Sequence, residues 1–168
     1  MKHLKLFFAL AAAWSLSTGF AWSTSISVGD YETVQVPFAT RHYGTEMVDL
    51  SVYVSSIGDT RTVKVLGSVN GDYYYSALLT KINYGTLNLP ETVTLSDGNV
   101  YTITAIGQQA FYNQQSAFLG ITIPASVTCI GEWAFACYNE SSSLESVTFA
   151  EGYNTPDFSD QCISQKKN

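Results

Sequence analysis

The chain has 168 residues, of which 46% are hydrophobic and 13% charged, and its net charge at pH 7 is −6. An acidic chain without a cluster of Lys and Arg is poorly suited to nucleic acid or to an anionic membrane surface, so neither is an expected partner. The length suits one domain, or two small ones that share a continuous core.

The first residues are predicted to be an export signal. Lys2 and Lys5 supply a positive start, an apolar run follows, and Ala21 offers a small residue at the cleavage position, with Ser23 as the alternative. The run is too short to span a bilayer comfortably. We expect removal of residues 1–21, a secreted or cell-surface chain without stable membrane insertion, and a net charge that falls from −6 to −8 with the two lysines. An uncleaved N-terminal anchor helix is the alternative.

Residues 24–85 predict an N-terminal β region. Residues 48–55 alternate between apolar and polar side chains, which is typical of a half-buried strand, and residues 62–65 repeat the alternation. Asn70-Gly71 is a strong hairpin signal because both residues tolerate positive φ. No clear linker separates this region from the next one, so it is expected to act as a cap.

Two segments farther along the chain contain the same sequence motif. Residues 106–111 read Ile-Gly-Gln-Gln-Ala-Phe and residues 130–135 read Ile-Gly-Glu-Trp-Ala-Phe, so the copies start 24 residues apart. Matching segments flank both copies: Pro-x-Thr/Ser-Val-Thr turns at 90–94 and 124–128, and alternating strands at 118–123 and 144–149. Such a unit cannot bury its apolar face alone and must stack on a neighbour. Asp97-Gly98 predicts a second hairpin, inserted into the first unit between residues 92–95 and 100–103.

The combined order of these segments resembles the BspA-type leucine-rich repeat family of bacterial and protist surface proteins. The resemblance covers residues 86–150 and is carried by ITAIGQQAF, LGITIPASVTCIGEWAFACYNESSSLESVTF and LPETVTLSDGNVYTITAIG. It implies a mainly β fold, a short leucine-rich-repeat solenoid of about two and a half repeats preceded by the N-terminal β-hairpin region. It also implies an extracellular adhesion or interaction protein without a catalytic centre in the repeats. A third Ile-Gly-x-x-Ala-Phe unit is missing, and residues 151–168 are a polar tail.

Catalytic chemistry has little support in the sequence. His42 is the one histidine left after signal removal, and a Cys–His pair with it is disfavoured because Cys129 and Cys137 lie in a repeat that explains them structurally. We therefore expect no enzyme activity, no metal and no cofactor. Gly107 and Gly131 indicate backbone geometry at matching turns and not a phosphate loop.

The cysteines and a run of tyrosines leave alternatives open. Three cysteines is an odd number for an exported chain, and Cys129 and Cys162 could pair, with Cys137 more consistent with a structural thiol. Residues 73–75 are all Tyr and could offer a stacking platform for sugars, although packing of one face on the core is the preferred interpretation.

Strand alternation predicts a ligand face. It directs into the core Leu87, Leu89, Ile121, Ile123, Val147 and Phe149, while Phe111 and Phe135 are expected to be equivalent core anchors. The outward residues form a small, uncharged candidate ligand face: Thr86, Asn88, Gly120, Thr122, Ser146 and Thr148. The expected partner is a host or bacterial surface protein or a glycan, and the last strand could mediate self-association through its edge. The alternative is a truncated or purely structural repeat fragment without a ligand of its own.

Overall fold

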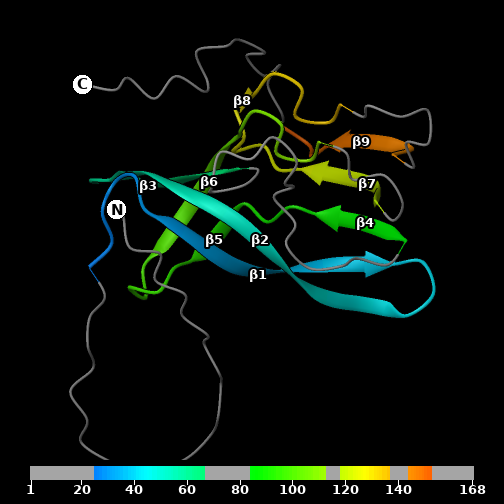
Figure 1. The fold of residues 1–168 in the computed structure, drawn as a ribbon, viewed down its shortest axis with the longest axis horizontal. Coiled ribbons are helices and arrows are strands. Elements are labelled where there is room, and N and C mark those ends of the chain that lie inside the picture. The colour runs from blue at the N-terminus through cyan, green and yellow to red at the C-terminus, as the bar shows by residue number, and fades with distance from the viewer. Residues whose placement is uncertain (1–24, 67–83, 113–117, 137–143, 153–168) are drawn as a thin grey trace, which may run out of the picture.

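The computed structural model describes residues 25–66, 84–112, 118–136 and 144–152, and these residues contain strands and turns but no helix. The strands are β1 (Tyr31–Thr40), β2 (Gly44–Ile57), β3 (Arg61–Val65), β4 (Gly85–Asn88), β5 (Thr92–Thr94), β6 (Val100–Ile106), β7 (Phe118–Ile123), β8 (Cys129–Ile130) and β9 (Ser146–Phe149) (Figure 1). A search of this part of the chain for a helix of membrane-spanning length and apolarity finds none.

All nine strands belong to one sheet with two parallel ladders. The strand order is β5-β6-β3-β2-β1-β4-β7-β9, and β8 pairs with β6 outside this path. In the first ladder β4, β7 and β9 run parallel, and Figure 1 shows them as successive arrows pointing the same way. In the second ladder β6 and β8 run parallel, with Ile106 opposite Ile130. These stacked ladders confirm the predicted mainly β, short leucine-rich-repeat fold.

The N-terminal strands close the first repeat on both ladders. β1 pairs antiparallel with β4, and β3 pairs parallel with β6. The Gly107 amide donates to the Val65 carbonyl at 2.6 Å, and the Gly131 amide donates to the Ile106 carbonyl at 2.7 Å. Because the two contacts are equivalent, β3 occupies the place of a preceding repeat.

The predicted alternation of residues 48–55 lies within β2, where Val48, Leu50, Val52 and Val54 are buried. The predicted strand at residues 62–65 lies within β3. Ser51 departs from the polar-outward pattern because it is also buried. It lies in a central strand opposite Thr33, where a side chain this short is readily covered by larger neighbours.

The hairpin predicted at Asp97-Gly98 is confirmed. β5 and β6 pair antiparallel, with Thr94 opposite Val100, and Gly98 has a φ of 77°. The hairpin is tied to the N-terminal strands through Ser96, whose hydroxyl donates to the Glu32 carboxylate at 2.7 Å. The hairpin predicted at Asn70-Gly71 lies outside the described residues, as do the export signal and residues 153–168 of the predicted tail.

Burial corrects part of the predicted core. Phe111 is 2% exposed, but Phe135 is only partly buried, so the two are not equivalent anchors even though their rings stack at 5.5 Å with planes 4° apart. Val147 and Phe149 are 37% and 40% exposed, although they pair in register with the buried Ile121 and Ile123. β9 is the last strand of the described sheet, and inward-facing residues there have a neighbouring strand on one side.

Candidate functional site

The first parallel ladder brings the six predicted ligand-face residues into two columns. Thr86, Gly120 and Ser146 form one column, since β7 pairs with both β4 and β9 at these positions. The second column contains Asn88, Thr122 and Thr148. Asn88, Ser146 and Thr148 are exposed, Thr86 and Thr122 are half-buried, and Gly120 is buried.

Because Gly120 has no side chain, the side chains of Thr86 and Ser146 can approach it closely in the first column. A Cβ atom at this position would lie 2.6 Å from the Ser146 hydroxyl oxygen and 3.3 Å from that of Thr86. The hydroxyls of the flanking strands therefore occupy the space that a side chain would fill. The face is small, polar and uncharged, and it can offer hydroxyl and amide groups to a ligand in strand register.

The N-terminal strands carry an aromatic cluster that is separate from the two columns. The rings of Tyr31 and Tyr53 meet edge to face at 5.1 Å, and the Lys64 ammonium nitrogen lies 4.6 Å from the centre of the Tyr53 ring. Burial lowers the pKa of Lys64 below its usual value. Since the ammonium group already contacts a ring, the cluster is accounted for as packing of β1, β2 and β3.

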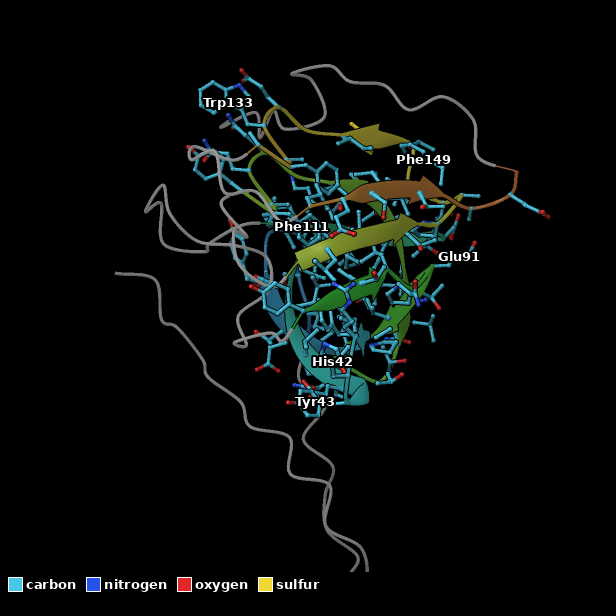
Figure 2. The ribbon with its side chains drawn as sticks, turned by 90° about the vertical axis from the view of Figure 1, so that its right-hand side faces the viewer. His42, Tyr43, Glu91, Phe111, Trp133 and Phe149 are labelled. Atoms are coloured by element: carbon cyan, nitrogen blue, oxygen red, sulfur yellow. The ribbon has the colours of Figure 1, made fainter. Side chains whose placement is uncertain are left out.

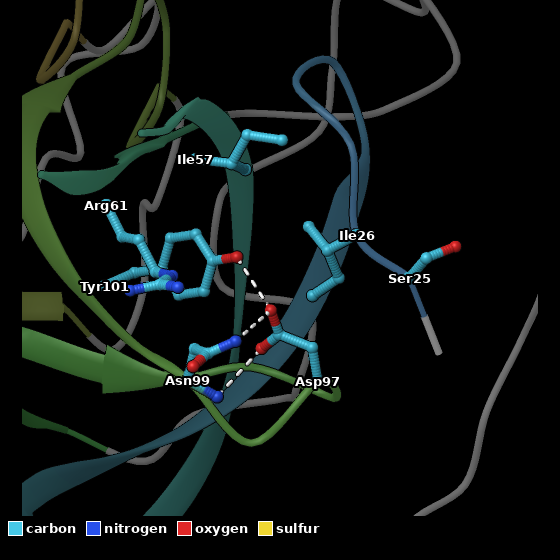
Figure 3. Close-up of a pocket in the computed structure, with 7 residues that line it drawn as sticks. All are labelled: Ser25, Ile26, Ile57, Arg61, Asp97, Asn99 and Tyr101. Atoms are coloured by element: carbon cyan, nitrogen blue, oxygen red, sulfur yellow. Dashed lines mark hydrogen bonds between the residues drawn. The ribbon is translucent and has the colours of Figure 1, made fainter. Parts of the chain in front are cut away.

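A shallow cavity of about 270 Å³ lies between the start of the described chain and the β5–β6 hairpin (Figure 3). Its lining residues are Ser25, Ile26, Ile57, Arg61, Asp97, Asn99 and Tyr101. The Asp97 carboxylate accepts hydrogen bonds from the Asn99 side chain at 2.8 Å, the Asn99 backbone amide at 2.9 Å and the Tyr101 hydroxyl at 2.9 Å.

These contacts set the electrostatics of the cavity. Desolvation raises the pKa of Asp97, but the hydrogen bonds from Asn99 and Tyr101 and the charge of Arg61 outweigh it, so the pKa is lowered. Desolvation, together with the hydrogen bond to Asp97, raises the pKa of the Tyr101 phenol. Asn99 and Tyr101 of the same hairpin, together with Arg61 of β3, thus favour the ionised carboxylate.

Of the residues considered for a Cys–His pair, the structure describes His42 and Cys129. His42 and Tyr43 are exposed at the tip of the β1–β2 hairpin (Figure 2). Cys129 is disulfide-bonded, so it offers no thiol to a Cys–His pair. Cys137 and Cys162 lie outside the described residues, and so do the tyrosines at 73–75. Within the described part of the chain, no three His, Cys, Asp or Glu side chains are grouped as metal ligands.

The two repeat glycines serve close backbone approach, as predicted. A Cβ on Gly131 would lie 2.5 Å from the Gln108 nitrogen and 2.7 Å from the Gly107 carbonyl carbon. A Cβ on Gly107 would lie 2.8 Å from the Val65 oxygen. Each glycine therefore stacks directly on the preceding layer.

Sequence reasoning missed an exposed aromatic pair at the repeat turns. Trp133 is 56% exposed, and its ring stacks with that of Tyr112 at a centroid distance of 6.4 Å. Trp133 has a positive φ of 58°, as does Gln109 at 56°, and the two residues occupy the same position in successive repeats. A signal for Trp133 was available in the sequence, because the two motifs differ only at their third and fourth positions, where Glu132 and Trp133 replace Gln108 and Gln109.

No protein-family model and no curated protein matches the sequence. Solved structures do match. The chain is similar to bacterial leucine-rich repeat proteins. A leucine-rich repeat protein from Bacteroides capillosus is 26% identical with a TM-score of 0.41, and the match covers 62% of this chain and 63% of that one.

Two further structures are matched. A leucine-rich cell surface protein from Faecalibacterium prausnitzii is 21% identical with a TM-score of 0.43, over 68% of this chain and 24% of that one. The pneumococcal vaccine antigen PcpA is 20% identical with a TM-score of 0.49, over 76% of this chain and 30% of that one. The chain thus spans less than two thirds of each matched protein. The stacked parallel ladders themselves define the fold.

Proposed function

We propose that the chain is a noncatalytic interaction module, exported to the cell surface or secreted, that binds a surface protein of a host or of bacteria through its outward repeat face. The observation that carries this proposal is the pair of register-aligned columns on β4, β7 and β9. A repeat scaffold presents such a column on rigid, hydrogen-bonded strands, which lowers the entropy lost on binding.

The chemistry of the columns limits the mode of binding. They contain hydroxyls, one amide and a glycine, and none of their six residues carries a charge. Binding should therefore depend on hydrogen bonds and shape, with only weak dependence on ionic strength. A glycan that presents hydroxyls in the same spacing is the other ligand class that this face suits.

The test replaces the centre of the second column. Thr122→Arg with Thr148→Arg places two long cations on the face without touching the core, and Thr92→Arg with Thr94→Arg on the exposed positions of β5 is the matched control. A partner is first captured from host matrix extracts with the wild-type chain, then purified for affinity measurement. We expect the column variant to lose about tenfold or more in affinity, ~1.4 kcal/mol, and the control to bind as the wild type does.

Two results would contradict the proposal. One is full affinity of a folded column variant, which would move the site elsewhere. The other is a steep fall in affinity with added salt, which would mean that charges outside the columns dominate. Circular dichroism and a thermal melt establish folding before either result is interpreted.

A structural repeat fragment without a ligand is the second candidate. It is favoured by the exposure of all four residues of β9, the last strand of the described sheet. Further Ile-Gly-x-x-Ala-Phe units encoded after Asn168 would support it. In that case β9 would pair with the next repeat, and the interaction surface would belong to the longer protein.

A further inference from the structure

Trp133 and Tyr112 form an open aromatic surface on two adjacent repeat turns. Their ring planes differ by 22°, and Trp133 is a mostly solvent-exposed indole. Figure 2 shows Trp133 at the end of the molecule opposite His42 and Tyr43. Nearly parallel rings in this position leave an aromatic face available to a ligand.

The backbone at Trp133 is unusual for its side chain. A left-handed φ is uncommon for any residue except glycine, and for a bulky one it is an outlier that calls for an explanation. Burial does not offset its energetic cost, since the indole remains exposed. In the preceding repeat the same backbone conformation carries Gln109, so the turn itself does not require an aromatic residue.

The two turns hold the pair in place before any ligand arrives. The Gln109 amide donates to the Glu132 carbonyl at 3.1 Å, and the Phe111 amide donates to the Ala134 carbonyl at 2.7 Å. Beneath them the Phe111 and Phe135 rings stack in parallel. A preorganised aromatic surface loses little conformational entropy when it binds.

Size and charge restrict the ligand. Two rings offer far less area than the roughly 800 Å² per partner that a stable protein interface buries. Glu132, next to Trp133, is an exposed carboxylate, and the chain as a whole is acidic, so sulfated or carboxylated ligands would be repelled. Gln108 and Glu132 are both exposed and can exchange hydrogen bonds with hydroxyl groups.

We propose that Tyr112 and Trp133 form a binding platform for a neutral pyranose ring of an oligosaccharide. The apolar C–H face of the sugar lies on the rings, and its equatorial hydroxyls meet Glu132 and Gln108. This platform lies on the repeat turns and not on the columns of β4, β7 and β9, so it does not depend on the proposed protein-binding function.

The probes are three neutral oligosaccharides: cellohexaose, mannohexaose and the hexamer of N-acetylglucosamine. Saturation-transfer NMR on the full exported chain detects binding, and calorimetry measures the affinity. The decisive variant is Trp133→Gln, because Gln109 already adopts the same φ in the neighbouring repeat and folding should be preserved. Tyr43→Ala, which removes another highly exposed aromatic ring, is the matched control.

We expect the wild type to bind at least one probe through its pyranose C–H protons. Trp133→Gln should weaken that binding by about tenfold or more, with an unchanged melting temperature, and Tyr112→Ala by a smaller factor. Tyr43→Ala and the Thr122→Arg, Thr148→Arg variant should bind the sugar as the wild type does. Failure of the wild type to bind any of the three probes would overturn the proposal, and so would equal affinity of Trp133→Gln. Loss of sugar binding in the Thr122→Arg, Thr148→Arg variant would overturn the assignment of the site to the turns.

Discussion

The two ends of the repeat stack carry equivalent inward side chains in different surroundings. Ile121 of β7 is 1% exposed, whereas Val147, its partner in β9, is one of the exposed apolar residues. At the first-repeat end, β1 and β3 extend both ladders, so Leu87 of β4 and Ile106 of β6 each have a paired residue on both sides. Burial in this fold is therefore supplied by the adjacent layer as much as by the sequence of the repeat itself.

The turns show the same asymmetry. Phe111 is buried between the layers, while Phe135 stacks on it and remains partly exposed. The exposed ends of the two repeats also differ chemically, since Trp133 stands where the first repeat has Gln109. Of the two described turns, the second thus carries the less buried Phe and an exposed Trp.

The largest expected effect is on stability at the turns. Phe111→Ala should lower the free energy of unfolding by about 3–5 kcal/mol, because a fully buried ring leaves a cavity. Phe135→Ala should cost less than half as much, about 1–2 kcal/mol, since the ring is only partly buried. Urea denaturation followed by circular dichroism measures both. Equal losses would mean that the second turn is as well packed as the first and that the asymmetry is absent in solution.

The strand positions allow a second comparison within one column. Ile121→Ala should cost about 2–5 kcal/mol as a core truncation. Val147→Ala should cost less than about 1 kcal/mol, because much of its surface already contacts water. If Val147→Ala instead destabilised the chain as strongly as Ile121→Ala, β9 would be covered in solution by a further layer or by a second copy.

Glycine substitution examines the contact between layers. Gly131→Ala forces a methyl group against the backbone of Gly107 and Gln108 and should cost about 1–3 kcal/mol. Gly58→Ala is the control, since the nearest atom to its Cβ would lie 3.9 Å away. That variant should stay within about 0.5 kcal/mol of the wild type. A neutral Gly131→Ala substitution in thermal melts would mean that the two turns are not in close contact.

Much of this architecture can be predicted from the sequence, for a physical reason. The repeated Ile-Gly-x-x-Ala-Phe motif predicts one layer of the stack for each copy. Its glycine packs against the backbone of the preceding layer, and the strands that flank it alternate between apolar and polar residues. The Asp97-Gly98 turn was predictable because its two residues locally determine the hairpin. Register was predictable as well, since the 24-residue offset between β6 and β8 places Ile106 opposite Ile130.

The features that the sequence did not predict depend on nonlocal neighbours. The parallel pairing of β3 with β6 joins segments with no shared motif, and no pattern in Val63 or Val65 names β6 as the partner. The exposure of Val147 depends on whether another strand covers β9, which alternation alone does not reveal. The two ligand-face columns were predictable in register. The sequence also marks Trp133 as different from Gln109 in the preceding repeat, but its contact with Tyr112 joins different positions of two turns and is not marked by the repeat.

The smallest expected effect is on the pH dependence of stability. It concerns the β5–β6 hairpin, which is inserted into the first repeat. Because the pKa of folded Asp97 is lowered, its interactions stabilise the native state above the unfolded value of about 3.9. That contribution is lost as the pH falls through the folded pKa. We therefore expect Asp97→Asn to be less stable than the wild type at pH 7, by a difference that shrinks progressively below about pH 4.

Urea denaturation of both proteins between pH 7 and pH 2 measures this difference, and subtraction cancels carboxylates that they share, such as Glu32. Asn is also well accepted in such a turn, so the hairpin itself should persist in the variant. Hydrogen exchange should locate the change in β6, which contains the Asp97 partner Tyr101, and in β5, which pairs with β6, and not in β9. A difference in stability that stayed constant across this range would show that the Asp97 carboxylate gains nothing from Asn99 and Tyr101. The hairpin would then be held by its backbone pairing and by the Ser96–Glu32 hydrogen bond.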